Sequence, residues 1–141
     1  MILPLRALLV ATTAALFLLA ATGIATAGGV VVVKTGKLSP LNNETAAGSV
    51  RLVRLAGGKR VLQLRNVNIG PGPALRVYLV AGRVDGNEDV AAFRDLGRLK
   101  SSAGNQQYLV RAAIDTNRYS TVVIWCDEFS VAFGKAALRR P

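Results

Sequence analysis

The chain has 141 residues and a formal net charge of +10, with one cysteine, one tryptophan and no histidine. The missing histidine removes the usual general base, the Ser-His-Asp and Cys-His nucleophile pairs, and the commonest ligand of zinc, copper and haem. A single cysteine cannot build a tetrahedral zinc site. The composition therefore excludes most hydrolases, and we expect neither a metal centre nor a cofactor.

The positive charge is spread along the chain from Lys34 to Arg140 rather than gathered in one run. Nucleic-acid binding normally shows a basic stripe together with stacking aromatic side chains. We therefore expect no nucleic-acid partner. A dispersed positive charge favours contact with anionic polymers of a cell envelope or with lipid head groups.

Residues 1–27 have the pattern of a secretory signal peptide. Arg6 supplies the positive n-region, residues 7–21 are apolar apart from two threonines, and Ala25-Thr26-Ala27 fits a cleavage site. The alternative is an uncleaved anchor, since residues 7–27 carry no charge and approach the roughly 20 residues that span a bilayer. We expect an exported protein, either extracellular, periplasmic or at the cell surface, and membrane-anchored if this signal helix is retained.

The remaining residues 28–141 predict one domain built from short strands. Apolar runs bounded by turn residues predict strands, in chain order, over residues 49–55, 61–65, 75–79, 96–99, 107–111, 121–126 and 130–133. Gly57-Gly58 predicts a hairpin turn, and Gly70-Pro71-Gly72-Pro73 predicts a turn that cannot continue a central strand. One helical turn is expected over residues 115–119. This pattern indicates an all-β fold, either a single antiparallel β-sandwich or a partly closed barrel.

The acidic segment Asp85-Gly86-Asn87-Glu88-Asp89 has the spacing of three calcium ligands. A calcium-binding hand would also need glycine at position 90 and glutamate at position 96, where this chain has Val90 and Leu96. We therefore interpret the segment as a solvated hairpin tip and predict no metal site there.

The lone thiol, Cys126, follows Trp125 at the end of an apolar run. An odd cysteine in an exported chain is a buried packing group, an intermolecular crosslinker or a reactive redox centre. In a strand Cys126 shares a face with Ile124, while Trp125 points the other way. Aliphatic neighbours favour inert packing, and so does Glu128, which we expect on the same face, because a carboxylate disfavours a thiolate. The residues alone leave all three alternatives open.

Several further motifs are shared with one known family. They are Gly48, Gly72-Pro73 before residues 75–79, residues 96–100 with 104–108, and the closing run from Tyr119 through Trp125-Cys126 to residues 129–134 and Leu138. On these motifs the chain resembles the DM-thirteen domain, an extracellular electron-transfer domain of Skeletor-like animal proteins and of exported bacterial proteins. The resemblance covers about residues 36–138.

The resemblance implies an all-β extracellular domain that takes part in redox reactions through the cysteine matching Cys126. Trp125 is then a candidate electron-conducting neighbour, and Tyr78, Tyr108 and Tyr119 are further candidates with ordinary aromatic packing as the alternative. Many members carry an aspartate after the Gly-Pro pair, where this chain has Ala74.

Our preferred hypothesis is an exported accessory redox module that acts through Cys126 on a partner protein in the envelope or at the cell surface. A surface thiol would also permit a disulfide-linked dimer. The alternative is a non-catalytic structural or binding β-sandwich that recognises a protein or an anionic envelope component. The exposure of the Cys126 sulfur discriminates between the two.

Overall fold

The computed structural model describes residues 29–141, so the predicted signal peptide or anchor over residues 1–27 lies outside the described residues. In chain order the elements are β1 (Val31–Pro40), β2 (Ala46–Arg54), β3 (Arg60–Ile69), β4 (Leu75–Ala81), the 3-10 turn η1 (Asn87–Asp89), β5 (Phe93–Arg98), β6 (Ala103–Val110), β7 (Tyr119–Cys126) and β8 (Val131–Ala137). Within residues 29–141, no helix is long and apolar enough to cross a membrane.

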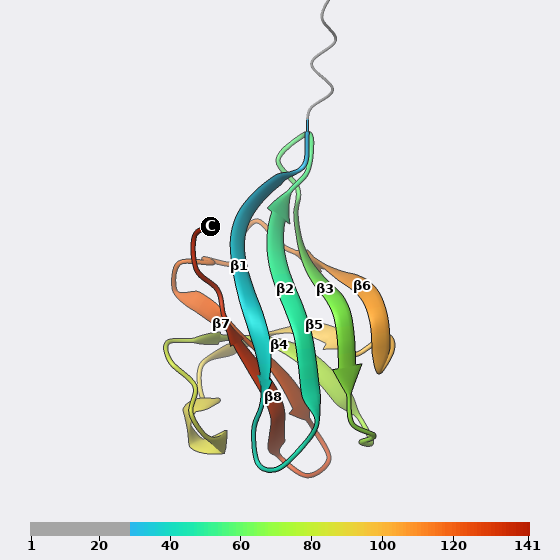
Figure 1. Ribbon diagram of the computed structural model, residues 1–141. Helices are drawn as coiled ribbons and strands as arrows, with labels where there is room; N and C mark the ends of the chain where they lie inside the picture. The colour runs from blue at the N-terminus through green and yellow to red at the C-terminus, as the bar shows by residue number, and fades with distance from the viewer. Residues whose placement is uncertain (1–28) are drawn as a thin grey trace, which may run out of the picture.

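The eight strands form one antiparallel sheet in the order β5-β4-β7-β8-β1-β2-β3-β6. The sheet curls around the core until its two edge strands, β5 and β6, touch without pairing, which makes a nearly closed barrel (Figure 1). β1 joins the two halves of the barrel because it pairs with β2 along most of its length and with β8 at Ser39 and Pro40. The predicted all-β fold is confirmed, in its partly closed barrel form.

Two turns predicted from the sequence are present in the structure. Gly57 and Gly58 connect β2 to β3 with φ values of 86° and 89°, a conformation that glycine adopts without strain. The expected turn over residues 115–119 is closed by a hydrogen bond from the Tyr119 N–H to the Asp115 carbonyl at 2.8 Å.

One strand, β1, is absent from the sequence prediction. Its register shifts between Val32 and Lys34, which marks a bulge or irregularity in the pairing with β2. Such an irregularity breaks the two-residue period on which strand prediction relies. β1 is therefore evident only once its neighbours in the sheet are known.

Apolar side chains fill the barrel and also cover part of its outside. All eight strands send side chains into or against the main cluster inside the barrel. A second cluster lies on the outer face of β4 and β7, where Tyr78 and Val123 are covered by Val84 from the segment after β4. Each fully buried aliphatic side chain stabilises the fold by about 1.5–3 kcal/mol. β4 and β7 are thus buried on both faces, which positions the residues at the end of β7 rigidly.

Two basic side chains serve the fold itself. The buried Lys34 donates from Nζ to the Thr116 carbonyl at 2.6 Å. Arg60 donates to the Thr116 hydroxyl at 3.1 Å and to the Ile114 carbonyl at 2.8 Å. Both hold the connection between β6 and β7 in place, so these positive charges are structural.

Candidate functional site

The predicted redox residue, Cys126, is the last residue of β7 and faces the barrel interior. It pairs with Leu75 of β4 on one side and with Val131 of β8 on the other, and it belongs to the main core cluster with Ile124. Its exposed fraction is 0%, which favours the structural alternative over a freely reactive surface thiol. The prediction that Cys126 and Ile124 share a face is confirmed. β7 ends at Cys126, however, so Glu128 lies in the following turn and not on the strand face of the thiol.

A loop of glycine and proline covers the sulfur. This covering loop, residues 70–74, connects β3 to β4, and the Cys126 thiol donates a hydrogen bond to the Pro73 carbonyl oxygen at 3.1 Å. Pro73 and Ala74 are themselves exposed. The sulfur therefore lies one residue layer below the surface. This is the one hydrogen bond of the sulfur within residues 29–141, and its acceptor is a neutral carbonyl oxygen.

The covering loop fits tightly against the core. A Cβ atom at Gly72 would lie 2.7 Å from Cζ of Phe133, so a larger residue would displace the loop or the ring. Ala74 has a φ of 54°, which is uncommon for a residue other than glycine. Its carbonyl accepts a hydrogen bond from the Asp127 N–H at 3.1 Å, which ties the loop to the β7–β8 turn. Direct contact between the thiol and solvent therefore requires movement of the loop.

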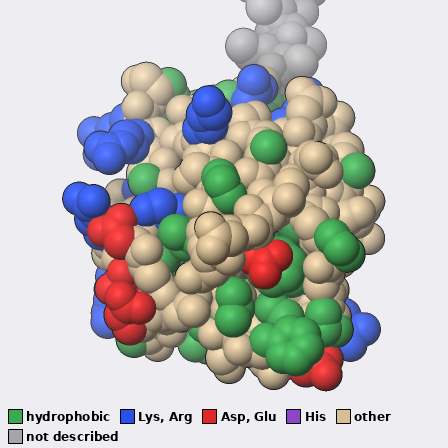
Figure 2. All heavy atoms as spheres, turned by 60° about the horizontal axis from the view of Figure 1, so that its bottom comes forward, with side chains coloured by type: hydrophobic (Ala, Val, Ile, Leu, Met, Phe, Trp, Pro, Cys, Tyr) green, Lys and Arg blue, Asp and Glu red, His purple; other side chains and the backbone are tan. Residues whose placement is uncertain are grey.

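The barrel end that carries the covering loop presents apolar surface. Figure 1 shows the β1–β2, β3–β4 and β7–β8 connections together at this end, and Figure 2 shows hydrophobic side chains gathered there with acidic ones beside them. Phe129 of the β7–β8 turn is 64% exposed. A hollow of about 420 Å³, lined by the covering loop and by residues 98–102, adjoins the loop. Exposed apolar surface of this kind is typical of interaction sites.

Trp125 points to the outer face of the sheet, where three aromatic rings stack. In this aromatic stack the Tyr78 ring centroid lies 4.2 Å from that of Phe93 and 6.1 Å from that of Trp125. Tyr78 is buried, whereas Phe93 is 38% exposed and Trp125 is partly buried. Burial raises the pKa of Tyr78, and the carboxylates of Asp127 and Asp95 raise that pKa further. The stack joins the protein surface to the residue next to the thiol.

The other two candidate tyrosines lie elsewhere. Tyr119 is at the opposite end of β7, where the guanidinium carbon of Arg94 lies 4.4 Å from its ring centroid. Tyr108 of β6 belongs to the main core, burial raises its pKa, and its hydroxyl donates to Gln106 at 2.6 Å. Of the three tyrosines named from the resemblance, the structure places Tyr78 alone against Trp125.

The acidic segment over residues 85–89 lies in the β4–β5 connection, as predicted for a hairpin tip, but its side chains hold it against β8 rather than leaving it fully solvated. Asp85 forms ion pairs with Arg83 and Lys135. The Asn87 side chain accepts a hydrogen bond from a backbone N–H of β8, and the Asp89 carboxylate accepts one from the backbone N–H of Asp85, both at 2.8 Å. Across the described residues, no three His, Cys, Asp or Glu side chains are grouped to hold a metal ion.

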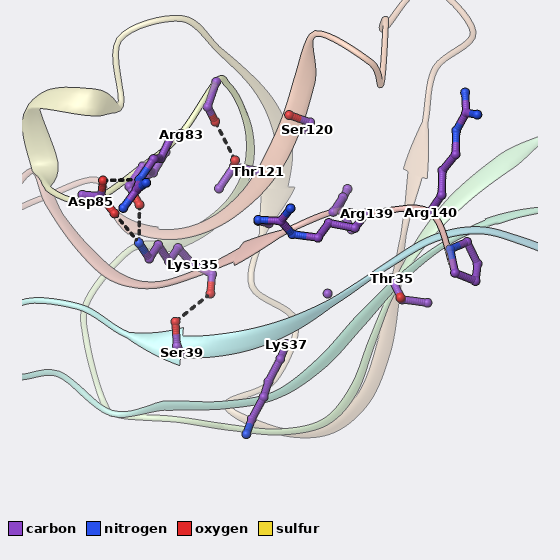
Figure 3. Close-up of a pocket in the computed structure, with 16 residues that line it drawn as sticks. Thr35, Lys37, Ser39, Arg83, Asp85, Ser120, Thr121, Lys135, Arg139 and Arg140 are labelled. Carbon is purple, nitrogen blue, oxygen red and sulfur yellow. Dashed lines mark hydrogen bonds and ion pairs between the residues drawn. The ribbon is translucent and has the colours of Figure 1, made fainter.

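A basic groove is the feature that sequence analysis missed. It has a volume of about 1110 Å³ and lies beside β8, between β1 and the segment over residues 82–85 (Figure 3). Its charged lining residues are Lys37, Arg83, Asp85, Lys135, Arg139 and Arg140. The chain supplies these residues from three distant segments, so no basic run indicates the groove. The one local signal is the spacing of Lys135 and Arg139, which places both on the same face of an extended strand.

The fold and the thiol together define a class of protein, a small antiparallel β-barrel with a lone cysteine enclosed beneath a glycine-proline loop. A sequence model of the family described as Electron transfer DM13 matches residues 37–138. The chain therefore belongs to the DM13 electron-transfer family. This is the DM-thirteen family that the sequence motifs resemble. In general terms, the chain is an electron-transfer module. Searches of curated proteins and of solved structures found no match.

Proposed function

We propose that this chain is an exported electron-transfer module that acts through Cys126 on a redox partner protein in the envelope or at the cell surface. The family match supports electron transfer in general. The signal-like sequence of residues 1–27 supports export, and the intact mass of the exported product tests whether it is cleaved before Gly28. The apolar barrel end around Phe129 supports docking of the partner beside the thiol.

The family match is the observation that carries this proposal, because the full burial of Cys126 by itself favours the alternative, a structural or binding β-sandwich. Cys126 is fully buried, yet its hydrogen-bond acceptor belongs to Pro73, an exposed residue. Burial protects a thiol from uncontrolled oxidation and from exchange with other thiols, which both require access. A single intervening residue layer still brings the sulfur close to a docked partner. The arrangement therefore favours electron exchange over formation of a disulfide-linked dimer.

In the proposed redox step, the electron and the proton both come from the Cys126 thiol. When an oxidised partner accepts one electron from the Cys126 thiol, the thiol also loses its proton and becomes a thiyl radical, which one electron from a reduced donor protein and one proton return to the thiol. The Pro73 carbonyl accepts the hydrogen bond from this proton but is a neutral amide oxygen, so the proton must pass to water past the covering loop. Trp125 is joined to Cys126 through one peptide bond and stacks with Tyr78, so the aromatic stack supplies a second contact surface for the partner.

Ferricyanide, a one-electron oxidant, provides the direct test on the purified domain. We expect the wild type to consume ferricyanide slowly and Cys126→Ser to consume none, because serine retains a hydrogen-bond donor to Pro73 but has no oxidisable sulfur. Trp125→Phe keeps an aromatic ring in the stack and should slow the reaction without abolishing it. Absorbance of ferricyanide gives the rate, and circular dichroism checks that each variant is folded.

Labelling of the thiol with a maleimide provides the matched measurement of access. We expect slow labelling of the native wild type and fast labelling in denaturant, because the sulfur is covered. Equal consumption of ferricyanide by the wild type and Cys126→Ser would refute the role of the thiol and favour the alternative, a structural or binding β-sandwich.

A further inference from the structure

We propose that the basic groove binds phosphate groups, with the Arg139 guanidinium as the central donor. This inference goes beyond electron transfer and shares no residue with the Cys126 site. The groove and the side chains that line it are drawn in Figure 3.

The groove is built on fixed backbone. Lys135, Ala137 and Arg139 alternate along β8 and its continuation, so their side chains share the outer face of the barrel. Arg139 is fixed by two backbone hydrogen bonds with Thr35 of β1, one in each direction, both at 2.8 Å. The opposite wall is tied to the sheet by the Thr121 hydroxyl, which donates to the Gly82 carbonyl at 2.6 Å. Little backbone order therefore remains to be gained when a ligand binds.

Asp85 is the one acidic side chain that lines the groove, and it is already paired. Asp85 accepts hydrogen bonds from Lys135 Nζ at 2.8 Å and from Arg83 Nε at 2.5 Å. These hydrogen bonds, that from Lys135 first, lower the pKa of Asp85, so the residue stays ionised at neutral pH. Lys135 Nζ also donates to the Val84 carbonyl at 2.6 Å. Asp85 thus holds the cations of Arg83 and Lys135 together in one cluster at one end of the groove.

Arg139 differs from these paired cations. Within residues 29–141, no ion pair and no side-chain hydrogen bond involves its guanidinium. Figure 3 shows the guanidinium extending toward the side where Asp85 and Lys135 lie, whereas Lys37 and Arg140 point away from that cluster. Arg139 and Arg83 both line the groove, so an anion that enters it is attracted by two guanidinium groups, of which that of Arg139 has no ion-pair partner within residues 29–141.

The chemistry of the lining favours phosphate. A guanidinium donates in a planar fork that fits two oxygens of a phosphate, and such charge-assisted hydrogen bonds are about twice as strong as neutral ones. The hydroxyls of Thr35 and Ser120 also line the groove. A volume of about 1110 Å³ exceeds what one phosphate fills and matches sites for larger ligands. The expected ligand is a phosphate attached to a larger group, either a phospholipid head group or a soluble polyphosphate.

Two probes distinguish these sources in one experiment on the purified protein. Sodium tripolyphosphate is titrated by calorimetry, and sedimentation measures binding to phosphatidylcholine vesicles with and without phosphatidylglycerol. We expect Arg139→Ala to weaken binding of whichever probe the wild type binds by roughly tenfold or more. The substitution removes a charged hydrogen-bond donor that contacts the ligand. The matched control, Arg54→Ala, removes the same charge from an exposed position on β2 and should change affinity less than about twofold, because it is screened from the groove.

Each outcome decides the proposal. Selective loss of tripolyphosphate binding in Arg139→Ala identifies a soluble phosphate ligand, and selective loss of vesicle binding identifies a lipid head group. Equal losses in Arg139→Ala and Arg54→Ala would show attraction by net charge alone and would overturn the proposal. If the wild type bound neither probe at low salt, the proposal would be overturned as well. Ferricyanide consumption by Arg139→Ala should match the wild type, so this test is independent of the thiol.

Discussion

Cys126 and Trp125 are neighbours in the chain but occupy opposite environments. The thiol faces the barrel interior, with no exposed surface and one neutral hydrogen-bond acceptor. The indole faces outward and stacks with Tyr78, which in turn stacks with the partly exposed Phe93. One peptide bond thus joins a closed inner site to an outer face that reaches solvent.

This difference teaches how a small barrel can hold a thiol that is protected and still close to the surface. The inner face supplies tight packing, which restricts access to sulfur. The outer face supplies aromatic surface that a partner can touch without entering the core. The following predictions test whether the two faces of β7 differ as much in energy and access as they do in geometry.

The largest expected effect is on stability, from truncating the inner face. Ile124→Ala removes a fully buried side chain beside Cys126 and should lower the free energy of unfolding by about 3 kcal/mol. Trp125→Ala removes a partly buried ring from the outer stack and should cost about 1–2 kcal/mol. Urea denaturation measures both. A larger cost for Trp125→Ala would reverse the comparison.

An intermediate effect is expected from forcing the covering loop away from the core. Gly72→Ala places a Cβ 2.7 Å from Phe133 and should destabilise the protein by about 1–3 kcal/mol. Because the displaced loop uncovers Cys126, maleimide labelling of the native protein should also become faster.

Gly70→Ala is the control in the same loop, since its added Cβ would lie 3.3 Å from the Thr45 Cβ of the β1–β2 connection, a milder contact than the one at Gly72. We expect it to label at nearly the rate of the wild type. If Gly72→Ala also labelled no faster, the loop would not be what limits access to the sulfur.

The smallest expected effect is a pH dependence that belongs to the outer face. Burial holds the pKa of Tyr78 above its ordinary value of 10.0. The folded protein therefore binds this proton more tightly than the unfolded chain, and the resulting stability is complete below about pH 10 and is lost as the pH rises toward the raised pKa.

Tyr78→Phe removes this titration but keeps the stacked ring. The free energy of unfolding should fall less steeply above pH 10 in Tyr78→Phe than in the wild type, as measured by urea denaturation across that range. Parallel pH profiles for the two proteins would mean that Tyr78 is not desolvated by the stack.

Particular residues explain which parts of the site could be predicted. The opposite orientations of Cys126 and Trp125 follow from the two-residue period of a strand, and the structure confirms that Cys126 shares the inner face with Ile124. The position of Glu128 was predicted wrongly, because the sequence does not specify that β7 ends at Cys126. The closure of the sulfur by Pro73 depends on a loop 53 residues away in the chain, which no local pattern reports.

The sequence by itself determined the all-β class, the hairpin at Gly57-Gly58 and the family, because each rests on residues close together in the chain or on its motifs. Only the tertiary structure decided that the thiol is covered and that Arg83, Lys135 and Arg139 line one groove. The physical reason is that burial and electric field depend on distances between segments, and the curled antiparallel sheet brings together segments that the chain keeps far apart.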